Sequence, residues 1–381
     1  MRLNIKFTKG PSWLITVIVP LFIFPANTFA FETKAEAAFV FDMTTGAILV
    51  SKNADTPLPP ASMSKLMTLY VAFEAIKLGQ LKLDERLPVS KNAQNYGGST
   101  MFLTVRDRVL VEDLLRGIIV LSGNDACAVI AEALSPDGTE KGFADLLNRR
   151  ARQIGLSNSV FKNSNGWPAK GHQMSMRDLA ILTKRLILDF PEFYPLFAQK
   201  EFLFDGRAPA NKVNRNPLLG LGIGADGLKT GHTQEAGYGL VGSAKQGDRR
   251  LIFVFTGLSS AAERAYEAEA IVNWAFRQFS IKSFGKKDTR IATAPVWNGN
   301  TANVGLKLTK DLKVLVPALT GKPVTFMIEY DSPIPAPIYA GQKIANLIVK
   351  AGDMEPVKIP LVANNEVLVG GYFNRILTAA K

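Results

Sequence analysis

The order of strand and helix patterns along residues 36–280 constrains the fold more than any other feature of this sequence. "AFVFDMTTGAILVSKN" predicts two strands around a Thr-Gly turn, because β-branched and aromatic residues flank the turn. "YGLVGSA" and "RRLIFVFTGL" predict two more strands near residue 250, and "AAERAYEAEAIVNWAFRQF" predicts a closing helix. Helical periodicity fills most of the chain between these two pairs of strands. This order predicts an α+β fold in which helices pack on one sheet.

The residue pattern changes after "SFGKKDTR", from helical periodicity to short strand candidates. "VTFMIEYD" alternates between apolar and polar residues, and "LKVLVPALTG", "KIANLIVKAGD" and "VKIPLV" are further short strand candidates separated by Pro, Gly and Asp. We therefore expect a first domain over residues 31–283 and a small all-β domain over residues 290–369.

The two ends of the chain carry signals of location. Three basic residues (Arg2, Lys6 and Lys9), the apolar run "WLITVIVPLFIF" and small residues ending at Ala30 form the layout of a secretory signal peptide over residues 1–30. The apolar run is about twelve residues long, whereas a membrane-spanning helix needs roughly 20. Export to the periplasm is therefore expected. Residues 370–381 predict a short amphipathic helix for weak peripheral contact with the outer face of the inner membrane.

Charge and cysteine content narrow the choice of partners. The formal net charge is +12, and removal of the three basic residues of the signal leaves 12 − 3 = +9. Such a protein favours anionic surfaces such as headgroups or cell-wall polymers. Nucleic acid is a poor fit, because Lys and Arg are scattered along the chain. Cys127 is the only cysteine, so no intrachain disulfide can form, and its apolar neighbours predict a buried side chain.

Several catalytic classes lack their sequence signatures. Histidine occurs only at positions 172 and 232, so a Ser-His-Asp site could use only one of those two. The sequence contains no G-x-S-x-G elbow, no H-E-x-x-H, no clustered Cys/His set and no glycine-rich nucleotide loop. We expect neither a metal nor an organic cofactor.

The stretch "LPPASMSKLMTLYV" offers a different catalytic chemistry. Residues three apart share a helix face, so the Ser62 hydroxyl and the Lys65 amine are expected within hydrogen-bond reach. Burial in this apolar segment favours the neutral form of the lysine, and a neutral amine beside a serine can activate it as a nucleophile. Taken alone, S-x-x-K is a common chance match, and an ordinary surface lysine is the alternative.

Two further motifs follow in the sequence. Ser122-Gly123-Asn124 interrupts two apolar helices, where Ser122 could relay protons and Asn124 could bind a substrate amide. "DGLKTGHT" precedes a predicted strand, and Lys229 with Thr230 would supply a cation and a hydroxyl to a substrate carboxylate. An ordinary turn and an edge-strand lysine are the alternatives for each motif alone. Their order and spacing behind a signal peptide make chance coincidence improbable.

These motifs resemble those of the D-alanyl-D-alanine carboxypeptidases, the low-molecular-mass penicillin-binding proteins. "PASMSKLMT", "LSGNDACAVIAEAL" and "DGLKTGHTQEAGYGLVGSA" carry the resemblance, which is close over residues 36–280 and looser after residue 290. It implies a penicillin-binding/β-lactamase-like transpeptidase domain followed by a β-sandwich. It also implies that peptidoglycan stem peptides are the substrates and that β-lactams are covalent inhibitors.

The resemblance also implies roles for individual residues. Ser62 would be the acylated nucleophile, Lys65 its base and Ser122 the proton relay. The residues that would bind substrate are Asn124, Lys229, Thr230, Gly231, His232, Thr233 and Arg264. Among these, His232 and Ser62 would form the oxyanion hole with their backbone N–H groups, and Arg264 would help to hold the terminal carboxylate. The implied reaction removes the terminal D-alanine from a stem pentapeptide in two acyl-transfer steps.

Three alternatives stay open at this point. A serine β-lactamase shares two of the motifs, but its E-x-x-L-N is replaced here by "ADLLN", with Ala144 in place of the glutamate. A wall-binding protein that lacks activity could keep the same fold. Endopeptidase or transpeptidase reactions use the same motifs.

Overall fold

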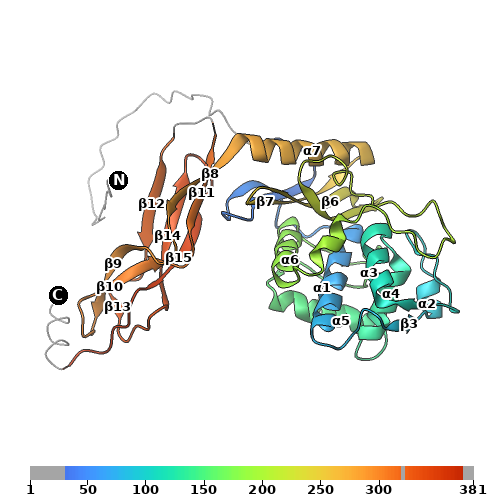
Figure 1. Cartoon of the computed structure of the whole chain (residues 1–381), viewed down its shortest axis with the longest axis horizontal. Coiled ribbons are helices and arrows are strands. Elements are labelled where there is room, and N and C mark those ends of the chain that lie inside the picture. Colours follow the sequence, from blue (N-terminus) through green and yellow to red (C-terminus); the bar gives the residue numbers. More distant parts are fainter. Residues whose placement is uncertain (1–30, 319–321, 372–381) are drawn as a thin grey trace. The chain divides into compact units, whose positions relative to one another are not determined.

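The computed structural model describes residues 31–318 and 322–371, so the predicted signal peptide and the predicted C-terminal helix lie outside the described residues. Residues from Phe31 onward form one compact unit. In the part of the chain that is described, no helix is both long and apolar enough to span a membrane. Figure 1 colours the elements by their position in the sequence.

The first half of the structure is built on a five-stranded antiparallel sheet in the order β2-β1-β7-β6-β5. Its strands are β1 (Ala37–Asp42), β2 (Ile48–Lys52), β5 (Ala225–Thr233), β6 (Gly237–Gln246) and β7 (Arg249–Leu258). The predicted strand pairs at both ends of this segment are confirmed, and they pair with each other through β1 and β7. The strand with the Lys-Thr-Gly motif, β5, lies at one edge of the sheet.

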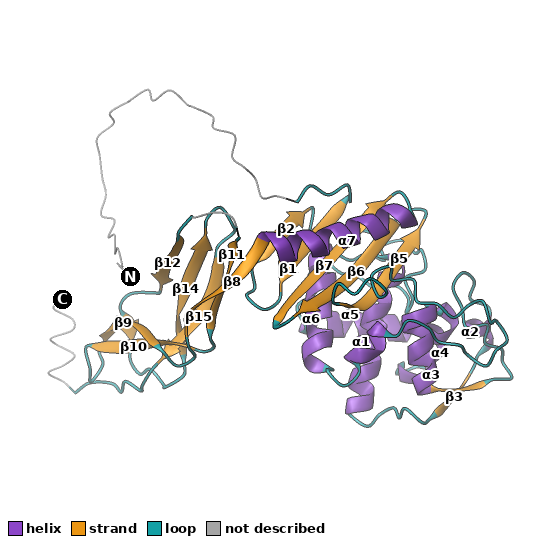
Figure 2. Cartoon of the chain, turned by 45° about the horizontal axis from the view of Figure 1, so that its top comes forward, coloured by secondary structure: helices purple, strands orange, loops and turns teal. Residues whose placement is uncertain are grey.

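Helices cover both faces of this sheet, as Figure 2 shows. Helix α7 (Ala261–Gln278) packs on one face, where it meets a set of alternating strand residues: Ala38, Val40, Leu240, Ala244, Leu251, Phe253 and Phe255. The opposite face, with Ala37, Phe39, Val241, Ile252 and Val254, packs against a cluster of helices. Alternate residues of the strands thus lie on opposite faces, and both sets are buried under helices, which gives a helix–sheet–helix arrangement.

The helical cluster comes from the middle of the sequence. It contains α1 (Lys65–Lys77), α2 (Lys91–Gln94), α3 (Val111–Arg116), α4 (Asn124–Leu134), α5 (Glu140–Gln153) and α6 (Met176–Asp189). Shorter elements are the 3₁₀ turns η1 (Ala61–Ser64) and η3 (Tyr194–Ala198), the π turn η2 (Gly117–Leu121), and the strands β3 (Arg86–Pro88) and β4 (Arg108–Leu110). The predicted helices are confirmed, including the break after residue 121.

Residues 279–318 and 322–371 form strands and loops without a helix. A six-stranded sheet has the order β12-β14-β15-β10-β9-β13, with β9 (Arg290–Trp297), β10 (Asn303–Leu308), β12 (Val324–Glu329), β13 (Ile334–Pro335), β14 (Lys343–Ala351) and β15 (Val357–Ala363). A two-stranded sheet pairs β8 (Phe279–Gly285) with β11 (Leu312–Pro317). Apolar residues of β11 share one core with the larger sheet, so the two sheets form a sandwich. Strand β8 precedes residue 290 and was not among the strand candidates, because Lys282 and Ser283 interrupt its apolar pattern.

Candidate active site

The amine of Lys65 is the centre of the site. Its Nζ lies 2.7 Å from Ser62 Oγ, 2.7 Å from Asn124 Oδ1 and 2.7 Å from the backbone oxygen of Asn165. The 3₁₀ turn η1 ends at Ser64, and α1 begins at Lys65, which places Ser62 and Lys65 on one face. The sequence predicted this pair, and the structure adds the two other oxygens.

The two oxygens decide how a neutral Lys65 would be oriented. Asn124 Nδ2 donates to the backbone oxygen of Gly97, so Asn124 turns its Oδ1 toward the lysine. Asn124 Oδ1 and the Asn165 carbonyl can only accept hydrogen bonds, so each needs one N–H of the amine. A neutral amine has two N–H groups and one lone pair. Its lone pair is therefore left for the third direction, which is toward the Ser62 hydroxyl.

Burial makes this neutral form accessible. The Lys65 side chain is 0% exposed. Burial, reinforced by the positive charge of Arg215, lowers the pKa of Lys65 to about 8, although Cys127 and Asp125 oppose the shift. The lysine in the apolar stretch is buried because the fold encloses it between α1, α4 and the 163–172 loop, and this burial increases its strength as a base near neutral pH.

The Ser-Gly-Asn break forms the second wall of the site. Ser122 has a left-handed backbone (φ +62°), which ends the π turn η2 and lets α4 begin at Asn124. The Asn124 N–H donates to Ser99 O at 2.7 Å. Ser122 is buried, and in the described structure it has no hydrogen bond to Ser62 or to Lys65. The structure thus brings Asn124 directly to the lysine, while Ser122 lies two residues before Asn124 in the chain and, among the described residues, makes no hydrogen bond to either catalytic residue.

The Lys-Thr-Gly strand forms the third wall. Lys229 and Thr230 are buried in β5, and Lys229 Nζ lies 3.2 Å from its neighbour's backbone oxygen. A Cβ on Gly231 would lie 2.9 Å from Met63 Cγ and 3.0 Å from Pro60 O. Glycine at this position therefore lets the strand approach the turn that carries Ser62. Burial and the charges of Lys65, Arg215 and Arg264 lower the pKa of Lys229 well below its usual value.

The remaining predicted residues lie at the end of β5 and on α7. His232 is exposed, and its ring lies 3.8 Å from that of Tyr238. The guanidinium carbon of Arg264 lies 5.6 Å from the centroid of the same Tyr238 ring, so Tyr238 contacts both His232 and Arg264. Arg264 is only 8% exposed, and its Nε has no partner among the described residues. Thr233 accepts a hydrogen bond from the Ala236 N–H and turns the chain after β5.

Sequence reasoning missed Arg215. It donates to Ser99 Oγ at 2.6 Å, and the backbone oxygen of Ser99 accepts the Asn124 N–H, so Arg215 is linked to the site through Ser99. Its positive charge also lowers the pKa values of Lys65, Lys229 and Arg264. Arg215 lies in a loop without periodicity, so no local signal could have identified it. The site thus contains four basic side chains that form no ion pair in the described part of the chain: Lys65, Arg215, Lys229 and Arg264. This concentration of positive charge fits an anionic ligand.

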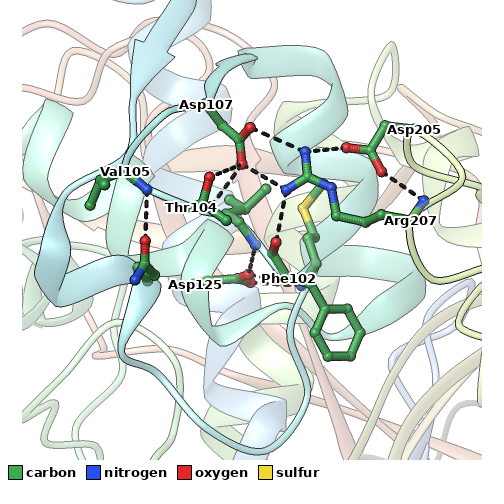
Figure 3. A network of polar contacts seen from close by, with 10 residues as sticks. Phe102, Thr104, Val105, Asp107, Asp125, Asp205 and Arg207 are labelled. Atoms are coloured by element: carbon green, nitrogen blue, oxygen red, sulfur yellow. Dashed lines mark hydrogen bonds and ion pairs between the residues drawn. The ribbon is translucent and has the colours of Figure 1, made fainter.

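A polar network holds the loops that carry Ser99 and Arg215 (Figure 3). Arg207 donates to Asp107 and to the Phe102 carbonyl, while Asp125 accepts hydrogen bonds from two backbone N–H groups of the same loop, those of Met101 and Leu103. Because Asp125 directly follows Asn124, the network also fixes the start of α4.

His172, for which the sequence analysis had no role, lies outside this group of contacts. Burial lowers its pKa to about 4, so its imidazole is neutral, and its Nδ1 accepts a hydrogen bond from the Lys162 N–H at 3.3 Å.

Comparisons with known proteins agree with this geometry. A family model described as D-alanyl-D-alanine carboxypeptidase matches residues 25–260, and a model described as penicillin-binding protein 5, C-terminal domain, matches residues 279–368. The D-alanyl-D-alanine carboxypeptidase DacC of Escherichia coli (strain K12) is 36% identical over 371 residues, which cover 93% of this chain and 92% of that protein. DacF of Bacillus subtilis (strain 168) is 32% identical, with 89% of this chain and 87% of that protein covered.

Solved structures give the same result. Penicillin-binding protein 5 from Haemophilus influenzae has a TM-score of 0.78 and 32% identity, and the match covers 88% of this chain and 98% of that one. Penicillin-binding protein D2 from Listeria monocytogenes, solved in an ampicillin-bound form, has a TM-score of 0.57 and 31% identity, with 64% and 98% covered. The chain belongs to the D-alanyl-D-alanine carboxypeptidase family of serine peptidases.

Proposed function

We propose that this protein removes the terminal D-alanine from peptidoglycan stem pentapeptides through an acyl-enzyme on Ser62. The observation that carries the proposal is the arrangement around Lys65 Nζ, which lies 2.7 Å from Ser62 Oγ while two acceptor oxygens take its N–H groups. That arrangement makes Lys65 a base directed at one hydroxyl.

In the first step, Lys65 takes the Ser62 proton, and Oγ attacks the carbonyl carbon between the last two alanines. The backbone N–H groups of Ser62 and His232 are assigned to the oxyanion, where each such donor contributes about 10²–10³ in rate in other enzymes. The C–N bond then breaks. The leaving amine takes a proton by way of Ser122, and D-alanine departs.

The cations orient the substrate for this step. Lys229, Thr230 and Arg264 are assigned to the terminal carboxylate, and Arg215 is added to them because its charge acts on the same residues. Asn124 is assigned to the backbone amide of the acyl donor. Gly231 and Thr233 belong to the same substrate-facing strand.

In the second step, water attacks the ester on Ser62 and releases the shortened peptide. Lys65 takes a proton from that water and passes it to Ser62 Oγ as the ester C–O bond breaks. The reaction limits the number of donor peptides for cross-linking and so acts in cell-wall remodelling. A β-lactam would acylate Ser62 in the same way as the peptide.

Location and organisation belong to the same proposal. Residues 1–30 would direct export to the periplasm, and residues 370–381 would add weak contact with the membrane surface. The catalytic and β-sandwich domains would span residues 31–283 and 290–369. The family models at residues 25–260 and 279–368 support two domains, but the second model begins at residue 279, where β8 already belongs to the sandwich.

The test is D-alanine release from a pentapeptide ending in D-Ala-D-Ala, by the mature protein and by Ser62→Ala. We expect release that the substitution abolishes, together with a lasting penicillin adduct found by intact mass in the wild type alone. Rapid penicillin turnover would favour a β-lactamase. A stable adduct without D-alanine release would favour an endopeptidase or transpeptidase, and the absence of both would favour a protein without activity.

A further inference from the structure

A groove adjoins the segment that leads into Ser62. It has a volume of about 460 Å³ and is lined by the chain before Ser62, by the 166–173 loop and by residues after β5, among them Pro60, Trp167, Lys170, His172, Thr233 and Glu235. We call it the 167–235 groove.

The direction of β5 relates the groove to the substrate. Lys229 and Thr230 are assigned to the terminal carboxylate, and the residues that line the groove follow them along the chain at Thr233 and Glu235. Ser62, where the scissile carbonyl must lie, comes directly after the Pro59–Ala61 wall of the groove. A peptide laid along this edge strand with its C-terminus at Lys229 therefore carries its preceding residue into the groove.

Two groups of opposite charge face the groove without partners. Lys170 and Glu235 are exposed, and neither has a hydrogen bond or an ion pair within residues 31–318 and 322–371. One supplies a cation and the other an anion. A ligand that satisfies both must itself carry both signs of charge.

A third polar group adds to the cationic side. His172 accepts the Lys162 N–H at Nδ1, which places its own proton on Nε2, and Nε2 has no partner among the described residues. His172 is 5% exposed and lines the groove two residues after Lys170. Two donors on one wall, an ammonium and an imidazole N–H, suit a carboxylate.

Trp167 supplies an apolar surface to the same groove. Its side chain is 45% exposed, although its backbone is held by Asn165 Oδ1 and by Asn163 Nδ2. A fixed indole face can pack against the methylene groups of a long side chain.

We propose that the 167–235 groove binds the side chain of the residue before D-Ala-D-Ala, and that Lys170 and Glu235 select a side chain ending in both a carboxylate and an ammonium, as in meso-diaminopimelate. This inference rests on the proposed function. Lys170, with His172 behind it, binds the carboxylate, and Glu235 binds the ammonium. An L-lysine side chain has the ammonium alone, so it satisfies Glu235 and leaves Lys170 unpaired.

The test compares two peptides, N-acyl-X-D-Ala-D-Ala, in which X is meso-diaminopimelate or L-lysine. We expect kcat/KM for D-alanine release to be higher for the diaminopimelate peptide by about two- to fivefold, the usual effect of one exposed ion pair. Lys170→Met should remove this difference by lowering kcat/KM for that peptide only, and Lys170→Glu should reverse it. Glu235→Gln should lower kcat/KM for both peptides.

Lys184→Met on α6 is the matched control, because it removes an exposed positive charge outside the groove and should leave the ratio unchanged. Equal kcat/KM values for the two peptides, or a ratio that Lys170→Met does not change, would overturn the inference while leaving the carboxypeptidase activity intact. Release from neither peptide by protein that still forms a penicillin adduct would instead refute the proposed function.

Discussion

The rate at which a β-lactam acylates Ser62 should rise with pH around 8. Lys65 must be neutral to take the serine proton, and burial lowers its pKa to about 8. From that pKa, the neutral fraction of Lys65 is about 9% at pH 7 and about 90% at pH 9. We therefore expect acylation to become about tenfold faster over this interval. A lysine with an ordinary pKa near 10.4 would be neutral in less than about 0.1% of molecules at pH 7.

The assay is the first-order rate constant of acylation by a fluorescent penicillin at saturating concentration, measured by rapid mixing between pH 6 and 9.5. Acylation is measured instead of turnover, because deacylation could limit turnover. A flat profile would refute Lys65 as the base. A rise of about 100-fold between pH 7 and 9 with no approach to a plateau would instead mean that the base has the ordinary lysine pKa.

Asn124→Asp makes this prediction sharper. It would place a carboxylate where Oδ1 now lies 2.7 Å from the lysine, and an opposite charge this close raises an amine pKa by about 1–3 units. At pH 7 the acylation rate should then fall about 10- to 1000-fold and should recover at higher pH. Asn124→Ala is the control, since it removes the same substrate contact without adding charge. If both variants keep the wild-type inflection, electrostatic control of Lys65 is wrong.

Three further substitutions test the scaffold of the site. Gly166→Ala should slow acylation and destabilise the protein by about 1–3 kcal/mol, because Gly166 has φ +81° and a Cβ there would lie 1.9 Å from Ala61 O. Penicillin labelling and thermal melting measure the two effects, and wild-type values for both would contradict the packing argument. Asp42→Asn should lower the free energy of unfolding in urea by about 3–5 kcal/mol, because the buried Arg249 guanidinium, 2.6 Å from the carboxylate, would lose its counter-charge. A loss below about 1 kcal/mol would show that this ion pair is dispensable. Glu140→Gln should slow acylation several-fold without moving the pH inflection, because the Glu140 carboxylate accepts hydrogen bonds from the Tyr96 and Ser164 hydroxyls on two loops beside the site. A shifted inflection would mean that Glu140 acts on Lys65 by charge.

The sequence predicted those parts of the site that depend on local spacing. Ser62 and Lys65 are three residues apart at the start of a helix, so local geometry alone brings them together. The polar break before Asn124 was visible because apolar helices flank it. In the same way, alternation and turn residues located the sheet and most strands of the second domain.

Contacts between distant loops could not be predicted in this way. Asn165 lies 100 residues from Lys65 in the sequence, and the contact uses its backbone oxygen, which any residue type could supply. Arg215 reaches Ser99 across 116 residues. The packing of Gly231 also depends on residues distant in the chain, because a Cβ there would lie 2.9 Å from Met63 Cγ and 3.0 Å from Pro60 O.

The four unpaired cations at the site also have a consequence for the thermal stability of the empty protein. Burial and mutual repulsion lower the pKa values of Lys65, Lys229 and Arg264, so folding brings together charges that repel one another until an anion arrives. A ligand with a carboxylate relieves that repulsion only in the native state, and therefore raises the melting temperature increasingly as its concentration exceeds its Kd. Buffers that contain acetate or phosphate should then act as weak competitors and weak stabilisers at the same time.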